Sequence, residues 1–120
     1  MHSVIELSTF IRAAEDLGLT EAERTSIVDL IASNPEAGDP IVGTGGCRKV
    51  RVAGQGRGKS GGYRVITFFT GPMIPAFLIT VYGKGRKANL TASERNILAG
   101  LTAELVRQYS GRVVPMRRKP

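Results

Sequence analysis

The stretch GTGGCRKVRV, from Gly43 to Val52, decides the fold of this 120-residue chain. Its second half alternates polar with apolar residues, which is typical of a half-buried β-strand. The valines are expected to face the core, and Lys49 and Arg51 to face outwards. Eight glycines lie between Gly43 and Gly62, so turns are expected on both sides of this strand.

Two apolar segments farther along the chain, 63–70 and 76–82, predict a second and a third strand. The turn between them contains Pro72 and Pro75, which cannot donate hydrogen bonds to a sheet. Because the connections are short, the three strands are expected to pair as an antiparallel meander. Residues 3–7 predict an additional edge strand. The expected sheet core is Val50, Val52, Val65, Ile66, Phe68, Ile79 and Val81.

Helices are expected before and after these strands. Apolar residues at helical spacing predict a helix over 8–17. A capping box of Thr20 and Glu23 starts a second helix, and Asn34-Pro35 ends it because the residue before a proline disfavours the α-conformation. The two helices form a hairpin. The residues expected to point inwards are Phe10, Ile11, Ala14, Leu17, Ile27, Leu30 and Ile31.

A second capping box, at Thr91 and Glu94, starts the last helix, which is expected to end near Ser110. The sequence therefore predicts a single α+β domain over residues 1–111. The basic tail over 112–120 is expected to be disordered. The inward stripe of the last helix is Leu98, Leu101, Leu105 and Tyr109.

Charge is distributed unevenly along the chain, whose net charge is +7. Residues 1–39 contain eight acidic and two basic side chains, whereas residues 40–93 contain nine basic and no acidic ones. Residues 94–120 contain six basic and two acidic side chains. A long acid-free stretch gives one face a positive potential, as a surface that binds a polyanion requires. A basic surface without a ligand is the alternative.

The composition disfavours several kinds of catalytic site. The loop 53–60 has a loose phosphate-loop pattern, but a strand follows where that motif needs a helix. His2 is the single histidine and lies at the terminus, where it is a poor general base. Cys47 is the single cysteine and is interpreted as a small residue beside a strand. No pair of acids lies in the basic region, which disfavours two-metal hydrolysis.

Metals, cofactors and membranes are also disfavoured. One histidine and one cysteine cannot build a zinc site from nitrogen and sulfur ligands, so no structural metal and no cofactor are expected. No apolar run approaches the ~20 residues of a membrane span. A cytoplasmic protein without a membrane partner is expected.

Lysine and arginine interleaved with tyrosine remain as the candidate chemistry. Arginine can hold a phosphate with two parallel hydrogen bonds, and tyrosine can stack on a base. RNA carries its own nucleophile, the 2′-hydroxyl. A cationic pocket that orients this oxygen and stabilises the pentacoordinate phosphorane can cleave RNA without a metal. A groove that only binds RNA fits the same residue types equally well.

Three segments carry a resemblance to a known family: DPIVGTGGCRKVRV (39–52), GKSGGYRVI (58–66) and LITVYGK (78–84). They resemble the RelE/ParE superfamily of bacterial toxins, and within it the HigB-type branch. The resemblance covers residues 5–109. It implies a small fold with a twisted antiparallel sheet and two helices packed on one side of it.

The resemblance also implies a function. Such toxins are ribosome-dependent mRNA endonucleases that a cognate antitoxin holds inactive. The implied partners are therefore this antitoxin and the 70S ribosome with bound mRNA. Two alternatives stay open, namely a ParE-like toxin that poisons DNA gyrase and an inactive relative that only binds RNA.

The resemblance implies working groups on the strands and just after the last one, and no secure general base among them. These groups are Lys49, Arg51, Arg64 and Lys84. The neighbouring cations and tyrosines are interpreted as contacts to RNA or the ribosome. They are Arg48, Arg57, Lys59, Tyr63, Tyr82, Arg86 and Lys87.

Overall fold

The computed structural model describes residues 2–53, 62–83 and 90–118, with side chains as far as Ser110. These residues form three helices and five strands. None of the described helices combines the length and the apolar character needed to cross a membrane. Five of the predicted site residues lie outside the described residues, namely Arg57, Lys59, Lys84, Arg86 and Lys87.

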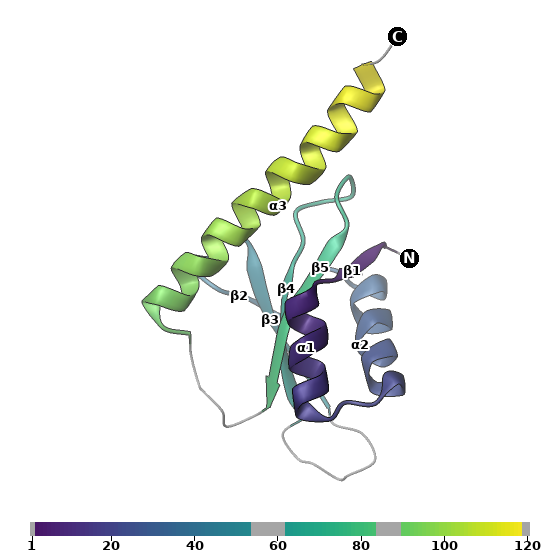
Figure 1. Cartoon of the computed structure of the whole chain (residues 1–120), viewed down its shortest axis with the longest axis vertical. Coiled ribbons are helices and arrows are strands. Elements are labelled where there is room, and N and C mark those ends of the chain that lie inside the picture. The colour runs from purple at the N-terminus through teal and green to yellow at the C-terminus, as the bar shows by residue number, and fades with distance from the viewer. Residues whose placement is uncertain (1, 54–61, 84–89, 119–120) are drawn as a thin grey trace.

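A five-stranded sheet with the strand order β1-β5-β4-β3-β2 forms the centre of the fold (Figure 1). Its middle strands are β3 (Cys47–Val52), β4 (Tyr63–Phe68) and β5 (Ala76–Gly83). They pair as antiparallel neighbours, which confirms the predicted meander. The α+β fold class is confirmed, and the arrangement of helices and sheet is consistent with a small RelE-like fold.

One of the two edge strands, β1, makes the sheet mixed rather than fully antiparallel. β1 (Val4–Glu6) confirms the predicted edge strand, but it runs parallel to β5. β2 (Asp39–Pro40) pairs with β3 in the antiparallel sense. The sequence did not predict β2, because two residues that include a proline carry no strand pattern.

The helices cover both faces of the sheet. α1 (Ser8–Leu17) and α2 (Glu21–Ser33) lie side by side, and α3 (Ala92–Arg118) runs apart from them (Figure 1). Side chains alternate between the faces along β4. Val65 therefore packs in one core with α1 and α2, and Ile66 packs in a second core with α3.

Most of the predicted inward positions are confirmed. Of the predicted sheet core, only Val52 is half-buried rather than buried. The prediction for Leu30 is wrong, because this side chain is 40% exposed on α2. Ile27 and Ile31, one helical turn apart, are buried and make the contact with the sheet, which leaves Leu30 at the flank of the stripe.

Both capping boxes are confirmed. Thr20 Oγ1 accepts from the Glu23 N–H and Thr91 Oγ1 from the Glu94 N–H, each at 3.1 Å, and each glutamate accepts from the threonine N–H in return.

The predicted end of the last helix is wrong, since α3 continues to Arg118. A glycine inside a helix costs only about 1 kcal/mol, so Gly111 does not end it. The division into a domain and a basic tail stays a prediction.

The GTGG loop fastens α3 to the sheet. Thr44 is fully buried, and its hydroxyl donates to the Ile41 carbonyl oxygen at 2.6 Å and accepts from the Cys47 N–H at 3.0 Å. From α3, Thr102 Oγ1 donates to the Thr44 carbonyl oxygen at 2.9 Å. Gly45 has a φ of +79°, and a Cβ there would lie 2.5 Å from Thr102 Oγ1. Glycine is therefore required where the loop and α3 touch.

Cys47 gives the fold a pH dependence that can be measured. Burial raises the pKa of this thiol from 9.0 to about 11, against the opposing effect of its hydrogen bond with Thr44. At a pH between these two pKa values, the thiol is mostly ionised in the unfolded chain but still mostly protonated in the folded one. The unfolded state then binds fewer protons, so the free energy of unfolding falls as the pH rises.

We expect Cys47→Ala to remove this part of the alkaline loss of stability. Urea unfolding of both proteins, at about pH 8 and at about pH 10, isolates the contribution because every other group is shared. The decline should be steeper in the parent protein than in Cys47→Ala. Equal declines in the two proteins would contradict the assignment to Cys47.

Candidate functional site

Three of the predicted site residues form one row across the sheet. Arg51 of β3 lies directly opposite Arg64 of β4, and Arg64 lies directly opposite Tyr82 of β5. Directly opposite residues in a sheet project to the same face, on strands about 4.8 Å apart. Ile66, two residues from Arg64, belongs to the core under α3, so the row lies on the α3 face.

A second row on the same face lies about 7 Å farther along the strands. Lys49 of β3 is opposite Ile66 of β4, and Ile66 is opposite Thr80 of β5. The two rows together bring Lys49, Arg51 and Arg64 close to one another. We refer to these three side chains as the cationic cluster.

The register of the cationic cluster brings like charges together. Like charges directly opposite each other on neighbouring strands are destabilising, by roughly 0.2–1 kcal/mol for a pair. Arg51 is exposed, whereas Lys49 and Arg64 are half-buried. The repulsion between Arg51 and Arg64 is one that an anion bound between them would offset.

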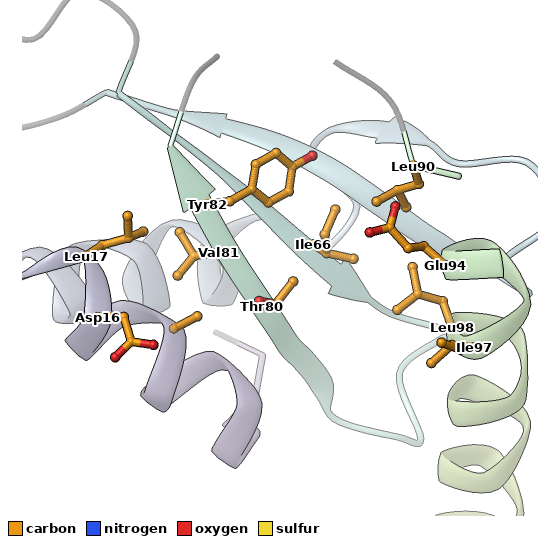
Figure 2. A pocket seen from close by; sticks show the side chains of 11 residues that line it. Asp16, Leu17, Ile66, Thr80, Val81, Tyr82, Leu90, Glu94, Ile97 and Leu98 are labelled. Atoms are coloured by element: carbon orange, nitrogen blue, oxygen red, sulfur yellow. The ribbon is translucent and has the colours of Figure 1, made fainter. Parts of the chain in front are cut away.

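A groove of about 460 Å³ adjoins the row at Tyr82. Figure 2 shows Leu17 and Asp16 of α1 on one side of it and Glu94, Ile97 and Leu98 of α3 on the other. Ile66, Thr80 and Tyr82 come from the sheet between them. The groove is largely apolar, and Tyr82 itself is only 9% exposed. A planar base fits such surroundings better than a phosphate does.

A second hollow, of about 410 Å³, adjoins the cationic cluster at Lys49 on the β2 side. Leu90 lines both hollows, so the two adjoin each other at this residue. The residues that line the second hollow are Asp39, Pro40, Ile41, Val42, Lys49, Leu90 and Arg95.

Arg95 is a cation of this region that the sequence analysis missed. It lies in the first turn of α3, is half-buried, and donates from Nη1 to the Leu90 carbonyl oxygen at 2.7 Å. The sequence did contain a signal for it. A helix macrodipole disfavours a cation in the first turn. An arginine at this position therefore indicates a role other than stabilising the helix.

Two other predicted contacts lie on the opposite face of the sheet. Tyr63 packs against the core under α1 and α2. Arg48 alternates with Lys49 along β3, and its Nη1 donates to the Gly38 carbonyl oxygen at 3.1 Å. The structure therefore brings Lys49, Arg51, Arg64 and Tyr82 together, but not Arg48 and Tyr63.

One comparison with known proteins bears on these residues. Over residues 3–114 the sequence matches the family described as the RelE toxin of the RelE/RelB toxin–antitoxin system. The matched range includes the cationic cluster, both hollows and the GTGG loop that fastens α3.

Proposed function

Because the chain belongs to the RelE toxin family, we propose that it cleaves messenger RNA on the ribosome and so inhibits translation. Its family makes it the toxin of a toxin–antitoxin system, with a cognate antitoxin as partner. We extend the proposal to the HigB-type branch, whose GTGG and GKSGG motifs it resembles, and to action in the cytoplasm, where ribosomes are found.

The observation that carries this proposal is the register of Arg51 opposite Arg64 and of Arg64 opposite Tyr82. Two guanidinium groups side by side can bind both non-bridging oxygens of one phosphodiester. Lys49, in the next row, adds a third positive charge. Negative charge on these oxygens grows as the phosphorane forms, so fixed cations stabilise the transition state more than the bound substrate.

The proposed reaction uses the nucleophile of the RNA itself. The 2′-hydroxyl gives its proton to a water molecule of the solvent, the bond from O2′ to phosphorus forms, and the bond from phosphorus to O5′ breaks. The leaving 5′-oxygen takes a proton from water, and the products are a 2′,3′-cyclic phosphate and a 5′-hydroxyl. The two rows contain no imidazole, and their one carboxylate, Asp39, lies opposite Lys49 on the edge strand β2. We therefore assign the alignment of the 2′-oxygen with the phosphate to the ribosome.

We expect the purified protein to cut mRNA on programmed ribosomes at discrete sites and to cut the same RNA poorly without ribosomes. Alignment of the reacting atoms contributes a large part of such a rate, and a free strand is not aligned. Primer extension on both substrates, with a chelator present throughout, measures the difference. Equal cleavage of free RNA would contradict the role given to the ribosome.

The same experiment in cells separates the alternatives. Growth arrest with intact mRNA and signs of DNA damage would favour a ParE-like action on gyrase. The absence of arrest would favour an inactive relative that only binds RNA. The opposed arginines suit the binding of RNA, so they favour the nuclease and the RNA-binding relative over a ParE-like action, and primer extension separates these two.

A further inference from the structure

We infer that Arg95 and Lys49 form a second phosphate site, which holds a phosphodiester of the RNA strand next to the one that is cleaved. The site is the 410 Å³ hollow between β2 and the start of α3. The inference rests on the proposed function, since it names a further contact for the same RNA strand.

The guanidinium of Arg95 is held in place before any ligand arrives. Its Nη1 donates to the Leu90 carbonyl oxygen at 2.7 Å. The side chain also passes close to Gly43, since Cδ and Nε lie 3.7 and 3.8 Å from the position that a Cβ there would take. The remaining N–H groups are available for an anion, and a guanidinium that is already positioned loses little entropy when it binds one.

Helix stability does not explain this arginine. The macrodipole of α3 disfavours a cation in the first turn. Glu94, the acid beside it, belongs to the capping box with Thr91. Within the described part of the chain Arg95 forms no ion pair. The positive end of the helix instead adds to the potential of Arg95, as an anion site requires.

The charge of the hollow matches a single phosphodiester. Its lining contains two cations, Lys49 and Arg95, and one carboxylate, Asp39. Asp39 lies directly opposite Lys49 in the β2–β3 pair, so it partly offsets that charge. One positive charge remains, and a phosphodiester carries one negative charge. Val42, 87% exposed at the rim, offers an apolar wall for a sugar or a base.

The position of the hollow suits a continuous strand. Lys49 belongs both to the hollow and to the cationic cluster. The row of Arg51 and Arg64 lies about 7 Å farther along the sheet, about the length of one nucleotide in an extended strand. An RNA strand can therefore place one phosphate between Arg95 and Lys49 and the next at the paired arginines.

The test compares two arginines of α3, one at the hollow and one away from it. Arg95→Gln removes a charge at the hollow, and Arg107→Gln removes one from an exposed pair with Glu104. The probe is a single-stranded RNA oligonucleotide with 2′-O-methyl groups, which cannot be cleaved. Its affinity is measured at several salt concentrations.

We expect Arg95→Gln to weaken binding about tenfold at low salt and to reduce the slope of log K against log salt by about 0.7. Arg107→Gln should stay within about twofold of the parent protein, with an unchanged slope. Equal effects of the two variants would overturn the inference. So would a loss of antitoxin binding in Arg95→Gln with unchanged RNA binding, since the hollow would then be a protein site.

A substitution that is expected to strengthen RNA binding provides a second test. Asp39→Asn removes the carboxylate that offsets Lys49, and it should strengthen binding of the same oligonucleotide about threefold at low salt. Unchanged or weaker binding by Asp39→Asn would count against the hollow as a phosphate site. Thermal unfolding of each variant shows whether the fold is retained.

The outcomes also separate this inference from the proposed function. A parent protein that binds the oligonucleotide through Arg95 but leaves ribosome-bound mRNA intact would retain the phosphate site and refute the nuclease. A protein that cleaves mRNA on ribosomes, with Arg95→Gln no different from Arg107→Gln, would retain the nuclease and refute the phosphate site.

Discussion

Replacement of Gly38 by alanine is expected to lower the free energy of unfolding by about 3 kcal/mol or more. Gly38 has a φ of +95°, a conformation that side chains with a Cβ rarely adopt. A Cβ there would lie 2.6 Å from the Lys49 carbonyl oxygen and 2.7 Å from Val50 Cγ2. Left-handed strain costs roughly 1–2 kcal/mol, and overpacking against a fixed strand costs typically 1–3 kcal/mol more.

Gly18 supplies the matched control for this prediction. It has a φ of +77°, but nothing lies within 4 Å of the position of its Cβ. Gly18→Ala should therefore show the strain alone, about 1 kcal/mol. Urea denaturation measures both variants. Equal losses in the two would contradict the argument that β3 leaves no room beside Gly38.

The parts of the fold that the sequence predicted are those with a local signal. Alternating residues in β3, apolar runs in β4 and β5, and the two capping boxes each point to one structure within a few residues. The sequence could not reveal β2, because Asp39–Pro40 pairs only through its position beside β3. The sequence could not reveal the parallel direction of β1 either. This direction depends on the path of the chain, because the helical hairpin separates β1 from the other strands in sequence.

The residue types of the candidate site follow from the sequence, but their arrangement does not, and their roles stay predictions. The strand cations and Tyr82 were singled out by residue type, and the alternation along β3 placed Lys49 and Arg51 on one face. The expected contacts at Arg48 and Tyr63 lie on the other face. Each is the immediate neighbour of a residue of the cationic cluster, and successive side chains of a strand point to opposite faces. Arg95 was missed because it is distant in sequence. Only the packing of α3 on the GTGG loop brings it beside Lys49.

A stability measurement on Arg64→Ala separates an effect on catalysis from an effect on folding. Arg64 lies opposite Arg51, so its removal relieves a repulsion between these two strands. Urea unfolding of Arg64→Ala beside the parent protein shows whether the fold is retained. A loss of activity at an unchanged unfolding midpoint is then an effect on catalysis.

Arg64→Ala is expected to lower the rate of mRNA cleavage on the ribosome by about 10²-fold, because losing one fixed donor to a developing negative charge typically costs ~3 kcal/mol. The loss should appear in the single-turnover rate at saturating toxin, since Lys49 and Arg51 still provide binding. Arg64→Lys should recover only part of the rate, because an ammonium group keeps the charge but lacks the paired donors of a guanidinium.

Arg107→Ala, which removes one exposed charge from α3, controls for net charge and should leave the rate unchanged. If Arg64 served only a surface ion pair, the effect would not exceed about 1 kcal/mol. An Arg64→Ala rate within about threefold of the parent would therefore remove Arg64 from the groups that stabilise the transition state.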